Sequence, residues 1–447
     1  MTQGSPIRLI FAVALPLMLG NVFQQMYTVI DAGIVGKNLG VNALAALGVS
    51  DWFNWLFLSA VQGLAQGFVV PMAQAFGAKD YPALRKNAGH AAVLSIFTGL
   101  LITVIAQIAI RPTLDLMGTP LLIRPMSVSY LTVLFAGLPV VMGFNLLSGI
   151  LRALGNGKSP LIAMIIGSIV NIALDFLFVS GFGWGVDSAA AATVIAQFSS
   201  FLYCLLRLAS IDFIRPSRND LHLTRPMTTR LLRLGIPIML QNAIIAIGGM
   251  ILQTVVNGLG VTFIAAYTAT NKLFGILETA GISFGYAMIT YSGQNLGAGK
   301  LERIRRGTRN GTILSVLASL TIGFVIISAG RFLLSGFIDM KAGDAAQVLD
   351  IAYEYLWFTC AALPALYILH IYRSTLQGIG NSAIPMYSGI AEFIMRVGCA
   401  ILLPGFISYR GIFVAEILAW FGADLMLVAG YFRVYQKLCS GFSEKSS

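Results

Sequence analysis

Four polar side chains in an otherwise apolar chain could together hold a cation: Asp31, Asn171, Asp175 and Thr193. Asn171 and Asp175 are four residues apart, so on a helix they share one face. Two carboxylates close together in a medium of low dielectric resist double ionisation. Such a pair can take up a proton near neutral pH, or hold Na⁺ with the amide and hydroxyl oxygens as further ligands. The alternative is that both aspartates hydrogen-bond the backbone and serve packing.

The elements that carry these side chains are long and apolar. Hydrophobic residues make up 57% of the chain and charged residues 11%, whereas a soluble domain carries about 25% charged residues. The mean hydropathy is +0.82. One helical crossing of a bilayer takes about 20 residues, and twelve stretches meet this length. They are 8–35, 45–70, 88–110, 127–153, 159–181, 189–209, 230–256, 265–291, 308–330, 354–376, 383–403 and 413–433.

A membrane β-barrel is the other way to span a bilayer, but its strands alternate apolar and polar residues over segments of about 10. The run 161–170 is apolar without alternation. We therefore predict an all-α polytopic membrane protein with twelve transmembrane helices.

The chain also repeats itself. The motif at 74–78, Gln-Ala-Phe-Gly-Ala, recurs at 294–298 as Gln-Asn-Leu-Gly-Ala. Leu-Gly-Asn at 154–156 recurs as Ile-Gly-Asn at 379–381. The offsets are 220 and 225 residues, nearly half of 447. Duplication of this kind is typical of secondary transporters, although it could also be retained for packing alone.

The repeat predicts two pseudo-symmetric six-helix bundles: an N-lobe over 1–209 and a C-lobe over 230–447, joined by a polar cytoplasmic linker over 210–229. Each lobe holds an even number of helices, so the axis that relates them should run along the membrane normal. The natural cavity then lies between the lobes.

Basic residues show which side of the membrane the loops face. Of 29 Lys and Arg, 20 fall in the N-terminus, the C-terminal tail and alternate loops, six in the opposite loops, and three inside helices. This is the positive-inside bias, and it predicts that both termini are cytoplasmic. The net charge of +11 is therefore a topology signal rather than a sign of nucleic-acid binding.

Motifs for other chemistry are weak. Residues 157–159, Gly-Lys-Ser, resemble the end of a P-loop, but the leading glycine position is Arg152 and proline follows. ATP is therefore not the expected energy source. The four cysteines have no CxxC spacing, and we find no catalytic constellation. We expect no enzyme activity and no cofactor other than a coupling ion.

Three further groups of residues could act in transport. Pro16 and Gly20 could form a hinge on the helix that carries Asp31, since proline removes a backbone hydrogen bond. Glu392 and Arg396, four residues apart, can neutralise each other, which leaves the C-lobe without an ion site. Methionine and aromatic side chains adapt to organic cations. The residues predicted to line the substrate cleft are Met26, Tyr27, Phe144, Gln241, Met250, Glu278, Phe284 and Met288.

Residues 24–48 resemble the first-helix signature of the multidrug and toxic compound extrusion (MATE) family, in its DinF-like and MepA-like prokaryotic branch. The repeated motifs and the Asn171–Asp175 pair also match. The resemblance implies a V-shaped pair of lobes and antiport, in which small organic, often cationic, compounds leave as H⁺ or Na⁺ enters. It implies a monomer in the bacterial plasma membrane that takes part in multidrug efflux.

The resemblance implies an N-lobe cation site of the DinF-like branch. That site comprises a helix-1 aspartate, an Asn and an Asp four residues apart on helix 5, and a helix-6 threonine. Here those are Asp31, Asn171, Asp175 and Thr193, and the helix-1 proline is Pro16. The NorM-like branch uses acids of C-lobe helices 7 and 10. Helix 7 of this chain has no acid, so an N-lobe site is favoured.

The alternative function is a lipid-linked oligosaccharide or polyprenyl flippase of the same superfamily, which would carry a basic cavity for a diphosphate. Intramembrane Lys272, Arg373 and Arg396 agree with this alternative, but Glu278 and Glu392 offset them.

Overall fold

The computed structural model describes residues 1–338 and 344–446, which contain helices and turns but no strand. The elements are α1 (Pro6–Leu39), α2 (Val41–Gly77), α3 (Tyr81–Leu116), α4 (Arg124–Ala136), α5 (Leu138–Ala153), α6 (Lys158–Asp175), η1 (Phe176–Gly181), α7 (Val186–Ala209), η2 (Asp212–Ile214), η3 (Arg218–Leu221), α8 (Arg225–Asn257), α9 (Val261–Gly297), α10 (Leu301–Ser335), α11 (Ala345–Gly378), α12 (Ala383–Leu402), α13 (Pro404–Ile407) and α14 (Arg410–Ser446). Within the described chain, eleven helices are long and apolar enough to cross a membrane, or twelve if a bent pair counts as one span. The predicted polytopic all-α class is confirmed.

The bent pair is α4 and α5, whose axes differ by 43° across Gly137. The single helix predicted over 127–153 is therefore a broken one. Pro139, in the first turn of α5, has no N–H to continue the helical ladder, and its ring disfavours a helical residue before it. The same Leu-Pro pair recurs 225 residues further on as Leu363-Pro364. Pro364 lies inside an unbroken α11, so proline alone does not decide the break.

The repeated Gly-Asn motif ends one helix and begins the next in both halves. Gly155 and Gly380 have φ of +85° and +88°, a conformation that favours glycine. The next residues, Asn156 and Asn381, each accept a hydrogen bond from the N–H three residues on, at 3.0 and 3.2 Å. The duplication of this sequence is therefore a duplication of the turn that joins two membrane helices.

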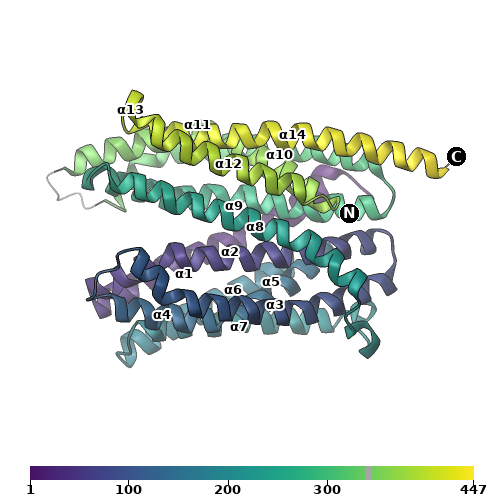
Figure 1. Ribbon diagram of the computed structural model, residues 1–447, viewed down its shortest axis with the longest axis horizontal. Helices are drawn as coiled ribbons and strands as arrows, with labels where there is room; N and C mark the ends of the chain where they lie inside the picture. The colour runs from purple at the N-terminus through teal and green to yellow at the C-terminus, as the bar shows by residue number, and fades with distance from the viewer. Residues whose placement is uncertain (339–343, 447) are drawn as a thin grey trace. The chain divides into compact units, whose positions relative to one another are not determined.

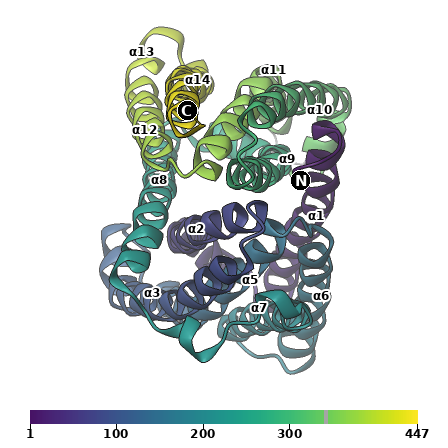
Figure 2. The same cartoon turned by 90° about the vertical axis from the view of Figure 1, so that its right-hand side faces the viewer.

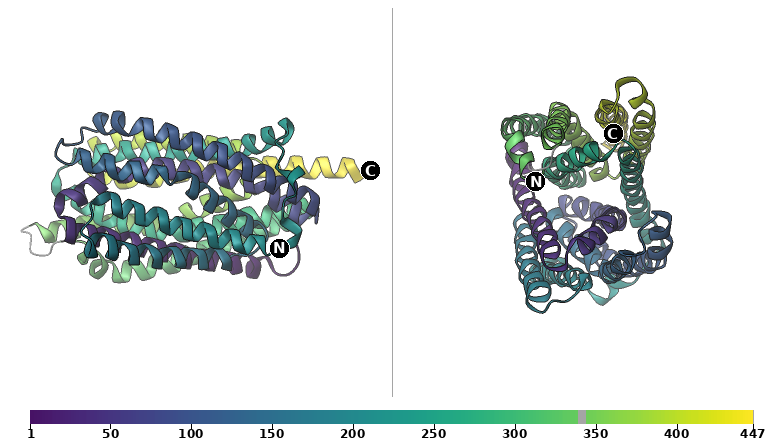
Figure 3. Two further views of the ribbon diagram at one scale, coloured as in Figure 1. Left: turned by 90° about the horizontal axis from the view of Figure 1, so that it is seen from below. Right: turned by 90° about the vertical axis from the view of Figure 1, so that its left-hand side faces the viewer.

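The chain packs into two compact units. The N-terminal unit is Leu15–Ala243, and the C-terminal unit is Met1–Ala14 with Ile244–Ser447. In the N-terminal unit α5 contacts α2, α3 and α7, and α6 pairs with α7 (Figure 1, Figure 2). In the C-terminal unit α11 contacts α9, α10 and α14, and the last turns of α14 extend beyond the other helices of that unit (Figure 3).

These units follow packing rather than the sequence repeat. Helices α1 and α8 each run without interruption from one unit into the other, with Pro16 and Pro237 inside them. Moreover α8 begins at Arg225, within the linker predicted over 210–229. The predicted lobes over 1–209 and 230–447 describe the two halves of the sequence repeat, and their boundaries remain a prediction.

Glycines let α8 approach α2 closely inside the N-terminal unit. A Cβ atom on Gly67 would lie 2.4 Å from the Cα atom of Gly235, and one on Gly63 would lie 2.9 Å from the Ile238 carbonyl oxygen. Small residues at such crossings are typical of membrane helices, where close van der Waals packing drives association.

Candidate cation site

The four residues predicted to hold a cation all lie in the N-terminal unit, on three helices. Asp31 is on α1, Asn171 and Asp175 are on α6, and Thr193 is on α7. Asn171 and Asp175 are fully buried, and Asp31 is 7% exposed. The Asn171 amide donates to the Thr193 hydroxyl at 3.3 Å. The carboxyl groups of Asp31 and Asp175 lie within side-chain interaction distance of each other.

Contacts on both sides of Asp31 hold α1 along α6 and its extension. Towards the N-terminus, a Cβ atom on Gly20 would lie 2.5 Å from the Met164 sulfur and 3.5 Å from the Leu161 Cα atom, so α1 packs closely on α6 there. Towards the C-terminus, the Asn38 amide donates to the Ser180 hydroxyl at 3.0 Å. The α1–α6 pairing thereby sets the Asp31 carboxyl opposite Asp175.

The backbone changes character at the site. Helix α6 ends at Asp175 and continues as a π-helical turn, η1, over Phe176–Gly181. Such turns are rare and occur frequently at functional sites. Three aromatic rings pack at its end: Trp184 lies 5.1 Å from Phe178 and from Phe182, centroid to centroid. Nothing in the apolar sequence of this stretch indicated a π turn.

Several oxygens of the site have no donor. Within residues 1–338 and 344–446, no group donates a hydrogen bond to Asp31 Oδ1, to either Asp175 oxygen, or to Asn171 Oδ1. A buried acceptor without a partner costs about 1–3 kcal/mol, and such groups are uncommon. This all-oxygen set suits a proton shared by the carboxyls or a hard cation such as Na⁺. The described chain holds no group of three or more His, Cys, Asp or Glu that could bind a metal, so a metal would need the amide and hydroxyl oxygens.

Two tyrosines border the site. Tyr27, predicted to line the substrate cleft, lies one helical turn before Asp31 and near both aspartates, and its hydroxyl interacts with the Gln24 and Gln197 side chains. Tyr130 on α4, 7% exposed, is also near both aspartates. The four-residue spacing from Asp31 could have indicated Tyr27. Tyr130 is about a hundred residues away in sequence and carries no local signal.

The C-terminal unit holds a buried ion-pair cluster instead. Arg396 donates to Glu392 at 2.7 Å across one turn of α12, and Arg373 on α11 donates to its other oxygen at 2.8 Å. All three residues are under 10% exposed. Helical spacing predicts the first pair, whereas Arg373 lies on another helix and its contact with Glu392 has no local sequence signal. On α14, Glu416 accepts from the Tyr355 hydroxyl at 3.0 Å.

The remaining predicted residues are divided between the units. The hinge residues Pro16 and Gly20 lie on α1 in the N-terminal unit. Phe144, Phe284 and Met288 are buried, whereas Met26 is 54% exposed. Of the predicted cleft, the N-terminal unit holds Met26, Tyr27, Phe144 and Gln241, and the C-terminal unit holds Met250, Glu278, Phe284 and Met288. Their roles in a cleft or hinge remain predictions.

A duplicated set of membrane-length helices with a buried carboxyl pair is the architecture of a polytopic membrane protein and is typical of secondary transporters. The sequence profile of the MatE family matches residues 16–177 and 237–402. This is more than half of the chain, so the protein belongs to the MatE family, and the predicted family is confirmed.

Relatives extend over most of the chain. It is 27% identical to the "Probable multidrug resistance protein YoeA" of Bacillus subtilis, over 94% of this chain and 92% of that protein. It is 26% identical to the "DNA damage-inducible protein F" of Escherichia coli, over 77% of this chain and 74% of that protein. A solved structure described as the outward-facing conformation of a multidrug resistance MATE family transporter aligns with a TM-score of 0.90 at 22% identity, over 98% of both chains. That likeness supports the fold.

Proposed function

We propose that this protein is a secondary antiporter that exports small organic, often cationic, compounds in exchange for H⁺ or Na⁺. The observation that carries the proposal is the pair of buried, facing carboxyls of Asp31 and Asp175. Asp31 Oδ1 and both Asp175 oxygens lack donors among the described residues. An ionisable residue at membrane depth is costly, about 2.5–3.5 kcal/mol on insertion scales, and is retained for ion pathways and proton relays. The names of the relatives supply the class of cargo.

The coupling scheme follows from electrostatics. Without a cation, two carboxylates repel each other at low dielectric, so Asp31 and Asp175 favour separation. A proton or Na⁺ between them removes the repulsion and favours their approach. Because Asp31 is on α1, cation binding biases the shape of that helix, and Pro16, which lacks the N–H of a regular turn, is the point where it bends.

Transport in proteoliposomes tests the scheme. Ethidium efflux should be measured under pH and Na⁺ gradients imposed separately, so that the coupling ion is identified. Asp31→Asn should bind ethidium yet fail to move it against a gradient, because the amide takes up no proton and lacks the negative charge that attracts Na⁺. Asp187→Asn, an exposed acid on α7, is the matched control and should transport like wild type. Uphill efflux by Asp31→Asn at the wild-type rate would refute the assignment.

Thr193→Val separates the two ions. Its hydroxyl accepts from Asn171 and can serve as a Na⁺ ligand, but a proton on a carboxyl does not require it. With Na⁺ as the coupling ion, we expect the Na⁺ concentration for half-maximal efflux to rise about tenfold or more, the usual scale for losing a group that supports a metal site. With H⁺, the pH dependence should change little.

We further propose that the protein lies in the plasma membrane of a bacterium as a monomer, with both termini in the cytoplasm. Single cysteines report this directly in a background with Cys204, Cys360, Cys399 and Cys439 replaced. A cysteine at the exposed Asn219 should react with a membrane-impermeant maleimide only from the inside, and one at Asp187 only from the outside. Reaction of both from one side would refute the topology.

The flippase alternative is weakened by the ion-pair cluster. A diphosphate needs free basic groups, but Arg373 and Arg396 both pair with Glu392.

A further inference from the structure

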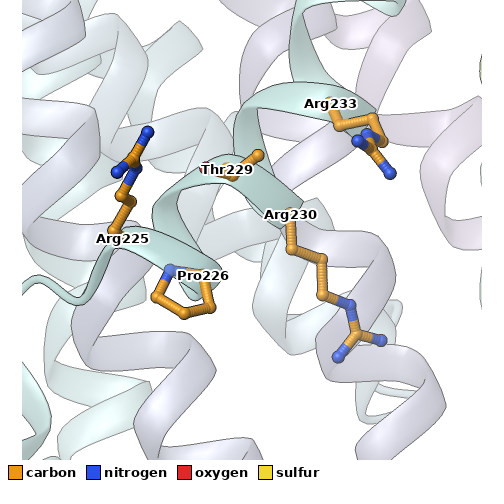
Figure 4. Close-up of a pocket in the computed structure, with 5 residues that line it drawn as sticks. All are labelled: Arg225, Pro226, Thr229, Arg230 and Arg233. Carbon is orange, nitrogen blue, oxygen red and sulfur yellow. The ribbon is translucent and has the colours of Figure 1, made fainter.

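A cavity of about 390 Å³ lies at the start of α8, in the N-terminal unit, and is lined by basic side chains (Figure 4). Its lining is Arg225, Pro226, Thr229, Arg230 and Arg233. Arg225, Thr229 and Arg233 follow one another at intervals of four residues, so they form one stripe of the helix, and Arg230 lies beside it. The lining includes three arginines and no acid.

The cavity lies where α8 changes from polar to apolar. Arg233 is the last charged residue before 234–257, which contain no Asp, Glu, Lys or Arg. These 24 residues span about 36 Å as a helix, enough for the hydrocarbon core of a bilayer. The three arginines lie on the first turns of α8, just before the helix enters that core. This places them at the depth of the lipid headgroups.

The backbone beside the cavity is fixed by contacts with α3. The N–H group of Thr224, the residue before α8, donates to His90 Nε2 at 3.1 Å, and His90 Nδ1 lies 3.1 Å from the carbonyl oxygen of Asp220. A Cβ atom on Gly89 would lie 2.4 Å from that same oxygen, so a glycine is needed where the linker packs. The start of α8 is thus held before any ligand arrives.

A contact with α2 fixes one of the guanidinium groups as well. Arg230 donates to Gln74 Oε1, at the end of α2, at 3.2 Å. This bond leaves the charge of Arg230 uncompensated, because its acceptor is a neutral amide.

The acids of the neighbouring linker have other partners. Asp212 pairs with Arg215 at 3.2 Å. Asp220 accepts from the N–H and hydroxyl groups of Ser217, both at 2.8 Å, and these hydrogen bonds lower the pKa of Asp220. The charges of Arg85 and Lys86 also lower the pKa of Asp220. Neither Asp212 nor Asp220 is among the residues that line the cavity.

We propose that Arg225, Arg230 and Arg233 bind the phosphate headgroup of an anionic phospholipid from the leaflet that surrounds the start of α8. Guanidinium groups bind phosphate oxygens through paired N–H donors. Basic pockets between membrane helices on the cytoplasmic side are known to take anionic headgroups. The site goes beyond export and does not depend on which ion or compound is transported.

Lipid binding to the full-length protein tests the site. Native mass spectrometry of the detergent-purified protein, titrated with phosphatidylglycerol, gives the dissociation constant of each bound lipid. Each arginine near an anionic surface lowers the dissociation constant about fivefold. The triple variant Arg225→Gln, Arg230→Gln and Arg233→Gln should therefore raise the dissociation constant of the tightest lipid site roughly a hundredfold. Phosphatidylcholine has a headgroup with no net charge. Its affinity for the wild type should therefore be no higher than its affinity for the triple Gln variant.

A matched control removes the same charge elsewhere. Arg305, Arg306 and Arg309 are exposed near the start of α10, and their triple change to Gln should leave phosphatidylglycerol affinity within about threefold of wild type. A triple change of the pocket arginines to Lys keeps the charge but loses the paired donors. It should bind with intermediate affinity, which also guards against misfolding of the Gln variant.

Two results would overturn the proposal. One is equal loss of lipid affinity in the pocket and control Gln variants, which would indicate general surface charge. The other is competition by millimolar inorganic phosphate that removes the lipid completely, which would indicate a site for a free anion.

Discussion

At the scale of the residue, the same carboxyl chemistry has two settings in this protein. Glu392 lies between two guanidinium groups at 2.7 and 2.8 Å and is fixed as an anion by them. Asp31 and Asp175 face each other, and no basic side chain among residues 1–338 and 344–446 forms an ion pair with either of them. The four-residue helical spacing predicts contacts within one helix, such as Glu392 with Arg396. It cannot predict Arg373 or Tyr130, because their positions depend on how distant helices pack.

Glu392→Gln should strongly destabilise the protein. The change removes the carboxylate that both buried arginines contact, and breaking a buried ion pair in this way costs about 3–5 kcal/mol. Thermal unfolding of the detergent-purified variant should show a clearly lowered midpoint.

The control is Glu302→Gln. Glu302 forms an ion pair of the same four-residue spacing with Arg306 at 3.1 Å, but both side chains are more than half exposed. Exposed pairs contribute about 0.2–1 kcal/mol, so its midpoint should stay near that of wild type. Similar midpoints for the two variants would show that the cluster has no structural role.

At the scale of the element, the sequence indicates where membrane helices lie but not where they deviate from regularity. Apolar length predicts the spans, and repeated motifs predict the Gly-Asn turns at 155–156 and 380–381. The break at Gly137 and the π turn after Asp175 depend on balances of a few kcal/mol between backbone hydrogen bonds and packing. No single residue type determines that balance, since Pro139 lies in a broken span and Pro364 in a continuous one.

Gly67→Ala should disrupt the crossing of α2 and α8. The new Cβ atom would lie 2.4 Å from the Cα atom of Gly235, and backbone cannot move aside as a flexible side chain can. Overpacking of this kind costs about 1–3 kcal/mol, sometimes more, so the thermal midpoint should fall.

Gly48→Ala on the same helix is the comparison. No atom lies within 4 Å of its added Cβ atom, and alanine favours a helix over glycine by about 1 kcal/mol. Its midpoint should be unchanged or higher. Equal stability of the two variants would mean that the helices do not need this close approach.

At the scale of the whole molecule, the duplication could be predicted from the sequence, but the compact units could not. Two continuous helices, α1 and α8, each belong partly to both units. Each contains a proline near the transition, Pro16 or Pro237. Sequence repeats record the ancestry of a segment, whereas unit membership records which residues it packs against. The two therefore differ most where a helix is shared.

The energetics of the proposed exchange give a prediction for the intact protein in vesicles. A membrane potential of about 100 mV contributes about 2.3 kcal/mol for each charge that crosses, which corresponds to roughly a fiftyfold gradient. When one proton enters for one neutral compound, one net charge moves, so potential alone should sustain up to that gradient. When one proton enters for one monovalent cation, no net charge moves, and only a pH gradient can drive export.

The measurement is the steady-state gradient of a neutral and a monovalent cationic substrate in proteoliposomes whose potential is clamped with K⁺ and valinomycin. At equal pH on both sides, wild type should accumulate the neutral compound on the side to which it is exported, but not the cation. Vesicles with Asp31→Asn should accumulate neither compound. Accumulation of the cation under potential alone would mean that more than one positive charge enters per cycle. The facing carboxyls of Asp31 and Asp175 would then be incomplete as a coupling site, and a second site would have to lie elsewhere in the chain.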